Sequence, residues 1–456
     1  MNGSMSVTVI GLGLAGSEAA WQLAERGVQV VAWEMRPVSN TPAHRTDRCA
    51  ELVCSNSFRS DELSTGPGLL KAELRAAGSL ILRVAQECRV AAGAAFAVDR
   101  EHFSEGVTRA ILSHPNITVR RGEIDAIPEE GAGPVLIATG PLTSDRLFDA
   151  IQRRIGSKAC FFFDAIAPRI MSDSIDFSRG FWASRYGKGE GEDYFNCPMS
   201  EQEYTAFWEA LRTAETVQPH LPGEAKLRFF EGCLPVEEMA RRGVETLAHG
   251  PMKPVGLRPG PADRNGSAGS GIHAVVQLRK DNREGTILGM VGFQTCLTYP
   301  EQRRVLRMIP ALERAAFAQL GSIHMNRYIH APSCLNASLQ MMTDPRIFFA
   351  GQICGVEGYI ESCATGFAAA VQIARISAGL PPAPFPCDTA IGALCRTVRD
   401  PARALNFQPQ NINFGILGGD PRAPREARSA RALRSLAQYL AAQDPRSLAA
   451  SAEVTS

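Results

Sequence analysis

The stretch Val7 to Gly16, VTVIGLGLAG, decides the fold. Its first four residues, 7–10, are all β-branched and predict a central, buried strand. Three glycines follow at Gly11, Gly13 and Gly16, in the spacing G-x-G-x-x-G. A strand that runs straight into such a loop is the first half of a dinucleotide-binding unit.

The residues that follow complete this unit. Ser17 to Gly27 has apolar residues at helical spacing, and Val28 to Trp33 predicts a second strand, which Glu34 ends. In such a unit the pyrophosphate lies on the helix N-terminus and the acid accepts hydrogen bonds from ribose hydroxyls. The residues predicted to bind the nucleotide are Gly11, Leu12, Gly13, Leu14, Ala15, Gly16 and Glu34. The alternative is a glycine turn without a ligand, and the motif alone does not separate FAD from NAD.

Length and composition narrow the class of protein. The 456 residues suggest about two to three domains. With 45% hydrophobic and 21% charged residues, the profile is that of a soluble globular protein. The formal net charge of +1 provides no general attraction to nucleic acid, so an RNA contact needs local basic clusters. We expect no DNA partner.

Neither a membrane span nor a metal site is predicted. The sequence has no run of about 18 apolar residues, and its N-terminus MNGSMS lacks the features of a signal peptide. The twelve cysteines include no C-x-x-C pair and no Cys/His cluster with zinc spacing. We therefore expect a cytoplasmic protein whose cysteines are mostly small buried thiols.

A second glycine-bearing unit lies far along the chain. Residues 347–366, IFFAGQICGVEGYIESCATG, predict a buried strand, a loop with Gly351, Gly355 and Gly358, and a helix of small residues. In FAD proteins such a late unit lies near the flavin, which favours FAD over NAD. A strand that ends in ATG at Gly140 closes the first nucleotide-binding region. The alternative for the late unit is a packing helix without a ligand contact.

Between these units the character of the sequence changes. From about residue 166 the chain is rich in aromatic residues and in glycine-rich polar segments, and the turn-rich stretch 258–271 predicts a hairpin connection. We expect an α/β fold in which an inserted α+β domain interrupts a Rossmann-like FAD-binding domain. The expected parts are 1–165 and 330–420 for the FAD-binding domain, 166–329 for the insertion, and 421–456 for an Ala/Arg-rich tail with a helical centre.

Two cysteines lie in settings suited to chemistry. Cys54 follows the first unit in a long polar loop, and Cys233 lies at a strand-to-helix turn between Gly232 and Pro235. A helix N-terminus lowers the pKa of a thiol and makes it nucleophilic. From the residues alone, a structural role remains open for both cysteines. His324 and His330 are candidates for binding a phosphate or a carboxylate.

Long, unusual strings give the sequence a more specific resemblance. They include VIGLGLAGSEAAWQLAERG (9–27), AELVCSNSFRSD (50–61), FWASRYGKGEGEDYFNCPM (181–199), FFEGCLPVEEMARRG (229–243), GQICGVEGYIES (351–362) and FQPQNINFGIL (407–417). With these, the chain resembles the folate/FAD-dependent tRNA uracil-5-methyltransferase family (TrmFO) from about residue 7 to 417. The resemblance implies a GidA-like fold. The stretch 324–332, HMNRYIHAP, and Cys354 depart from the family pattern.

The resemblance also implies a reaction. Methylenetetrahydrofolate would supply the carbon through reduced FAD, NADH or NADPH would restore the reduced flavin, and the product would be 5-methyluridine at the T-loop uridine (uridine-54) of tRNA. Cys233 matches the family's nucleophile, which adds to uracil C6, and Cys54 matches its partner in acid/base catalysis; the sequence leaves open which cysteine has which role. The alternatives are the same chemistry on ribosomal RNA, a small-molecule FAD oxidoreductase, and a non-catalytic RNA-binding flavoprotein.

Overall fold

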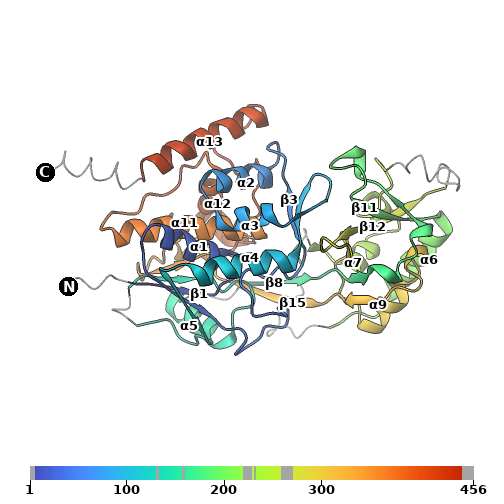
Figure 1. Ribbon diagram of the computed structural model, residues 1–456, viewed down its shortest axis with the longest axis horizontal. Helices are drawn as coiled ribbons and strands as arrows, with labels where there is room; N and C mark the ends of the chain where they lie inside the picture. Colours follow the sequence, from blue (N-terminus) through green and yellow to red (C-terminus); the bar gives the residue numbers. More distant parts are fainter. Residues whose placement is uncertain are drawn as a thin grey trace.

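The computed structural model describes residues 6–129, 133–156, 160–218, 229–230, 233–257 and 271–443. A five-stranded parallel sheet, of which β1 is labelled in Figure 1, forms its first part, and the strand order is β16-β7-β1-β2-β6. Its strands are β1 (Val7–Ile10), β2 (Val30–Glu34), β6 (Ile117–Arg121), β7 (Val135–Ile137) and β16 (Ile347–Phe349). The order shows that a strand from the late glycine-bearing unit completes the sheet begun by the N-terminal one.

The N-terminal unit folds as the sequence predicts, with shifted boundaries. Helix α1 (Leu14–Glu25) begins three residues earlier than expected, because Gly13 already has the extended conformation of an N-cap. Strand β2 begins at Val30 and ends at Glu34. Helix α11 (Tyr359–Ser377) packs closely on α1, and a Cβ at Gly366 would lie 2.2 Å from the carbonyl oxygen of Ala15. The two glycine-bearing units therefore meet face to face.

Further elements surround this sheet. Around it are α2 (Gly66–Ala76), α3 (Leu80–Glu87), α4 (Arg100–Ser113), α5 (Asp145–Ile155), α10 (Ala331–Cys334) and α12 (Ala390–Val398), and a small antiparallel sheet of β3 (Ser57–Ser60), β5 (Ala95–Val98) and β4 (Arg89–Val90). Most of their buried apolar side chains join one hydrophobic cluster that includes residues from Val7 to Leu436, while Val90, Ala92 and Ala97 form a small separate cluster at β4 and β5. This cluster gives the nucleotide-binding region a rigid base.

A second hydrophobic cluster, from Ile170 to Ala315, lies beside the first. Its six-stranded antiparallel sheet consists of β10 (Phe181–Trp182), β11 (Tyr194–Met199), β12 (Ala274–Lys280), β13 (Ile287–Met290), β9 (Arg169–Met171) and β14 (Phe317–Gln319), in that order. The helices are α6 (Glu201–Thr213), α7 (Val236–Arg241), α8 (Glu245–His249) and α9 (Tyr299–Leu306). Apart from Gly271, the hairpin connection expected at 258–271 lies outside the described residues.

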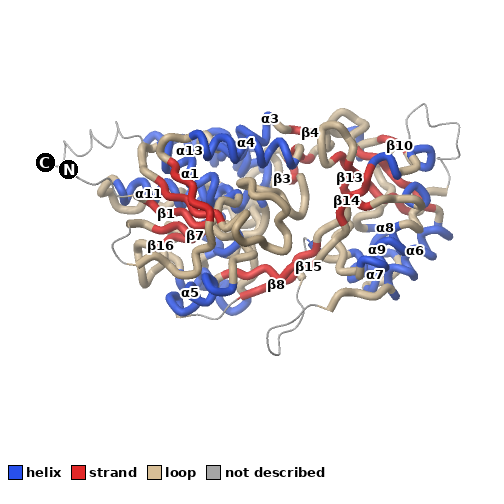
Figure 2. The backbone as a smooth tube through the Cα atoms, turned by 60° about the horizontal axis from the view of Figure 1, so that its bottom comes forward, coloured by secondary structure: helices blue, strands red, loops and turns tan. Residues whose placement is uncertain are grey.

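An antiparallel ribbon of two strands connects the two parts (Figure 2). Strand β8 (Cys160–Ala165) carries the chain toward the second part, and β15 (Ile323–Tyr328) brings it back. The strands pair along their whole length, with Ala165 opposite Ile323 and Cys160 opposite Tyr328. The chain thus leaves and re-enters the first part at one place.

The C-terminal region ends in a long helix. Helix α13 (Arg425–Ala441) has the helical centre predicted for the Ala/Arg-rich tail, and it lies alongside α2 (Figure 1). Arg428 is buried and donates to the carbonyl oxygens of Phe414 and Leu417. Residues 444–456 lie outside the described part. Among the described residues, no helix combines the length and apolar character needed to cross a bilayer.

Candidate active site

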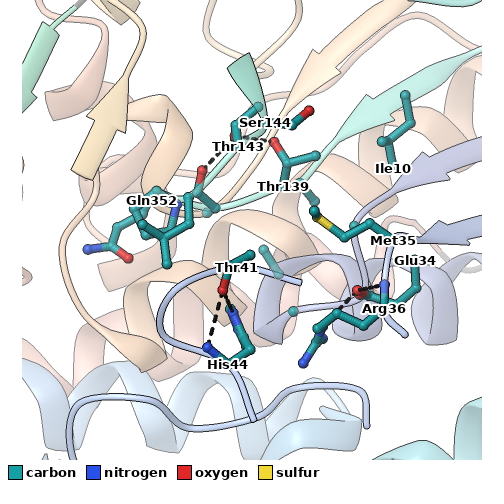
Figure 3. A pocket seen from close by; sticks show the side chains of 18 of the residues that line it. Ile10, Glu34, Met35, Arg36, Thr41, His44, Thr139, Thr143, Ser144 and Gln352 are labelled. Atoms are coloured by element: carbon teal, nitrogen blue, oxygen red, sulfur yellow. Dashed lines mark hydrogen bonds and ion pairs between the residues drawn. The ribbon is translucent and has the colours of Figure 1, made fainter. Parts of the chain in front are cut away.

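A cavity of about 1060 Å³ opens at the carboxyl ends of the parallel strands (Figure 3). This is the edge of an open α/β sheet where ligands bind. Of the residues predicted to bind the cofactor, the cavity is lined by Gly11, Gly13, Leu14, Ala15, Glu34, Gly140 and Gly351. The wall contains residues at the carboxyl ends of β1 and β2 and residues that follow shortly after β7 and β16. Segments far apart in the sequence therefore meet here.

The glycine loop leaves room for a ligand at one position and contacts the protein backbone at another. A Cβ at Gly13 would have no heavy atom within 4 Å, and the backbone there has a φ of −68° that any residue adopts. A Cβ at Gly16 would lie 1.8 Å from the carbonyl oxygen of Gly11. The open space at Gly13 is therefore a cradle at the N-terminus of α1, while Gly16 allows the helix to approach the strand.

Glu34 lies at the end of β2, where hydrogen bonds hold its carboxylate but leave one acceptor position free. Its carboxylate accepts hydrogen bonds from the backbone N–H of Leu12 at 3.1 Å and from Arg36 through the backbone N–H at 3.1 Å and Nε at 2.8 Å. Burial alone would raise the pKa of Glu34, but the contacts with Arg36 and Leu12 outweigh it and hold the pKa below its usual value. A carboxylate has about four acceptor positions, and these contacts use three, which leaves one for a ribose hydroxyl.

The wall also includes several neutral polar side chains (Figure 3). His44 Nδ1 lies 2.6 Å from Thr41 Oγ1, and burial lowers the pKa of His44 to about 4. Thr139 and Thr143 share a hydrogen bond of 2.6 Å beside Gly140. Because His44 is neutral at physiological pH, Glu34 and its neighbours dominate the electrostatics of this wall.

Four of the predicted cofactor residues lie outside this lining. Leu12 is buried and acts through its N–H bond to Glu34, and Gly16 packs against Gly11. Gly355 faces the ring of Phe407, which a Cβ would approach to 2.4 Å. Gly358 lines a neighbouring cavity instead. Sequence spacing alone does not tell which glycines of the late loop face a ligand and which turn the chain.

The two candidate cysteines meet in that neighbouring cavity, of about 1360 Å³, which we call the thiol cavity. Cys54 comes from the long loop after β2, and Cys233 from the segment before α7. The cavity at the carboxyl ends of the parallel strands is called the nucleotide cavity below. The thiol cavity shares part of its wall with it, through Val53, Pro141, Leu142, Gln352 and Tyr359. A ligand in one cavity therefore lies next to a ligand in the other.

Cys54 is held by the hydroxyl of Tyr359. The Tyr359 oxygen lies 3.0 Å from Cys54 Sγ and accepts from the backbone N–H groups of Cys54 at 2.9 Å and Ser55 at 3.2 Å. Burial, and next the negative charge of Asp164, raises the pKa of Cys54 to about 12. Cys54 is thus a protonated thiol in this structure.

The second part of the chain fixes the loop that carries Cys54. Arg279 of β12 donates to Asn56 Oδ1 from Nη2 at 2.7 Å and from Nε at 3.0 Å, and to Ser55 Oγ at 3.2 Å. Asn56 in turn donates to the carbonyl oxygen of Lys280 at 3.1 Å. These bonds join the Cys54 loop to the sheet of the second part.

Cys233 does not have the lowered pKa that its predicted position suggested. Helix α7 begins only at Val236, and it has six residues. Burial, and next the charge of Asp164, raises the pKa of Cys233 well above its usual value. In both cysteines, desolvation and a nearby carboxylate favour the protonated form of the thiol.

Asp164 and Glu357 are site residues that the sequence analysis missed. Both are buried and line the thiol cavity, as does His324, whereas His330 does not line it. The signal for Asp164 was a single acid inside the apolar strand FFFDAIA (161–167). A charged residue at an inward position of a buried strand indicates a functional group more often than a packing residue.

Comparisons with known proteins agree with this architecture. The family model described as "Glucose inhibited division protein A" matches residues 6–381. The structure of Aquifex aeolicus GidA in its form II crystal superposes with a TM-score of 0.68 at 15% identity, covering 95% of this chain and 73% of that chain. At this identity the likeness shows the fold alone: a GidA-like α/β fold of the FAD-binding type.

Three relatives carry the name "Methylenetetrahydrofolate--tRNA-(uracil-5-)-methyltransferase TrmFO". The protein from Geobacter sulfurreducens is 52% identical over 96% of this chain and 99% of its own length. Those from Persephonella marina and Aquifex aeolicus are 51% and 50% identical, over 94% and 95% of this chain and 96% of each relative. With this identity over nearly the whole length, the chain belongs to the TrmFO family.

Proposed function

We propose that this protein methylates C5 of the T-loop uridine (uridine-54) in tRNA, with methylenetetrahydrofolate as carbon donor, FAD as bound cofactor and NADH or NADPH as reductant. The observation that carries the proposal is the position of Cys54 and Cys233, which line one cavity next to a nucleotide cavity. The names of the relatives support the donor and the RNA class. We propose the cytoplasm as the compartment, and all twelve cysteines are free thiols, as is usual there.

The nucleotide cavity fits FAD. Gly13 leaves an open cradle for a pyrophosphate at the N-terminus of α1, and Glu34 keeps an acceptor position for a ribose hydroxyl. Gly140 and Gly351 line the same cavity, and each directly precedes a residue of the wall that it shares with the thiol cavity, Pro141 and Gln352. When bound, FAD would supply the redox-active ring that carries a one-carbon unit and hydride equivalents.

The thiol cavity supports a covalent step on uracil. C5 of uracil is a weak nucleophile, and addition of a thiol at C6 turns C5 into an enolate-like carbon. We assign this addition to Cys233, and acid/base catalysis to Cys54, which Tyr359 holds in place. A uridine in a folded tRNA loop has to leave its stack to enter such a cavity, as in other enzymes that act on bases.

Nucleoside analysis tests the proposal with the flavin-loaded enzyme. We expect a tRNA transcript to gain 5-methyluridine when methylenetetrahydrofolate and NADPH are present, and Cys233→Ser to lose this activity while retaining FAD absorbance. Cys387→Ser, which alters an exposed thiol, is the matched control and should leave activity unchanged. Activity with S-adenosylmethionine instead of the folate, full activity of Cys233→Ser, or methylation of ribosomal RNA but not tRNA would contradict the proposal.

A further inference from the structure

Asp164 is a buried carboxyl group that lines the thiol cavity together with Cys233. It lies on β8 of the connecting ribbon, and its carboxylate contacts the thiol of Cys233 and the side chain of Asn326 on β15. Within the part of the chain that the structure describes, its Oδ1 atom has no hydrogen-bond partner. A buried carboxylate oxygen that has no hydrogen-bond donor keeps a free acceptor position.

The surrounding charges determine which carboxyl group in this cavity is ionised. Glu357 follows the late glycine loop; burial, and next the charge of Asp164, raises the pKa of Glu357 to about 8. Burial raises the pKa of Asp164 itself to about 6. Because the charge of Asp164 raises the pKa of Glu357, ionisation of one carboxyl group disfavours ionisation of the other, and the two titrate as a coupled pair.

The other charged groups around the thiol cavity are engaged with partners of their own. Arg59 pairs with Glu361 at 3.2 Å, and Arg100 with Asp281 at 2.9 Å. His324, opposite Asp164 in the ribbon, contacts Ser322 Oγ at 2.9 Å, and burial lowers its pKa. Among the described residues, the other titratable groups near Asp164 include Cys54, Cys233 and Cys296, whose pKa values its charge raises, and Tyr359, whose pKa burial raises; all are protonated at neutral pH.

We propose that Asp164 is the general base that takes the Sγ proton of Cys233 as its sulfur bonds to C6 of the target uracil. The inference rests on the proposed function. The S–H bond breaks and an O–H bond forms on the Asp164 carboxylate, while the sulfur electron pair forms the S–C6 bond. The π pair of C5=C6 moves to C5 and into the C4 carbonyl. When the S–C6 bond breaks after methylation, the proton returns to sulfur, so Asp164 is regenerated.

The same geometry explains why the thiol is protonated at rest. A carboxylate next to sulfur opposes a free thiolate, because two negative charges would then share a cavity shielded from water. The proton can leave only as bond formation to uracil removes the charge from sulfur. Asp164 thus keeps Cys233 unreactive toward small electrophiles until a uridine occupies the cavity.

The variant Asp164→Asn separates the two effects of the carboxylate. Methylation of the tRNA transcript by the flavin-loaded enzyme should fall by about a hundredfold or more, the usual contribution of a general base. The midpoint pH for alkylation of Cys233 by iodoacetamide, followed by peptide mass analysis with Cys387 as internal reference, should shift downward. Loss of a structural support would instead raise the alkylation plateau without moving its midpoint.

Two further variants serve as controls. Glu357→Gln removes a carboxyl group whose charge also raises the pKa of Cys233, but by less than Asp164 does, so the alkylation midpoint of Cys233 should move less than in Asp164→Asn. Asp164→Glu restores a carboxylate and should methylate tRNA faster than Asp164→Asn. This comparison tests the base role even if Asp164→Asn loses FAD.

Each outcome bears on one of two claims. Wild-type methylation by Asp164→Asn, an unshifted alkylation midpoint, or an Asp164→Glu variant no faster than Asp164→Asn would overturn the base role. Failure of the wild-type enzyme to methylate tRNA would overturn the proposed function and with it this step. In that case a shifted midpoint would still mark a carboxylate–thiol contact, so the two failures are distinguishable.

Discussion

The substitution Gly13→Ala tests whether the open cradle at the start of α1 holds a pyrophosphate. In the protein alone the new methyl group would meet nothing within 4 Å, and a φ of −68° suits alanine. Losing glycine's chain entropy stabilises by about 0.4–1 kcal/mol, and the poorer N-cap costs a similar amount. The free energy of unfolding should therefore change by less than about 1 kcal/mol.

In contrast to the stability, the affinity of Gly13→Ala for FAD should fall strongly. A methyl group in the cradle would hold a pyrophosphate away from the first N–H groups of α1, and charge-assisted bonds of this kind contribute roughly 1.5–3 kcal/mol each. Loss of even one such bond predicts that the dissociation constant of FAD rises by at least about tenfold, or about 1.4 kcal/mol. Flavin fluorescence titration of the apoprotein measures this, and thermal unfolding without FAD measures the stability.

Gly16→Ala is the matched comparison, three residues further along. Its methyl group would lie 1.8 Å from the carbonyl oxygen of Gly11, so the backbone of α1 or β1 would have to move. We expect a loss of stability of several kcal/mol even without FAD. Normal FAD affinity in Gly13→Ala, or equal loss of stability in both variants, would refute the assignment of the cradle.

Two further predictions concern the Cys54 loop and α12. Arg279→Ala removes three hydrogen bonds to Asn56 and Ser55, so methylation should slow by about tenfold or more while FAD content stays constant; an unchanged single-turnover rate would contradict this. Glu73 accepts from the first N–H groups of α12, and burial raises its pKa to about 8. The native state then binds more protons than the unfolded chain between the usual Glu pKa and about 8, so raising the pH through this window lowers stability. In Glu73→Gln the melting temperature should depend less steeply on pH in this window. Equal pH slopes in the variant and the wild-type protein would contradict the prediction.

The N-terminal unit could be predicted because its signal is local. Four β-branched residues, three glycines and an acid occupy Val7 to Glu34, and each needs only its neighbours in sequence to indicate its role. The structure confirms β1, α1 and β2 within three residues of the expected boundaries. The division into 1–165, 166–329, 330–420 and 421–456 stays a prediction. The described residues form two large hydrophobic clusters and a small third one.

The thiol cavity depends on long-range contacts that no local pattern contains. Cys54 meets Tyr359, 305 residues away, and its loop is bound by Arg279. Gly355 and Gly358 share a loop, but one faces a phenylalanine ring and the other a cavity, which spacing does not determine. The raised thiol pKa values likewise come from burial, which only the fold reveals.

The ribbon of β8 and β15 has a consequence for how this enzyme can be divided. Every residue that lines the nucleotide cavity lies at 10–147 or 351–362, outside the chain that the ribbon carries away. Because Ala165 and Ile323 are cross-strand partners, a tight turn between them would close the loop and excise the intervening chain. The shortened protein would keep all the walls of the cofactor site but lose the sulfur of Cys233, which makes flavin capture and methyl delivery separable tasks.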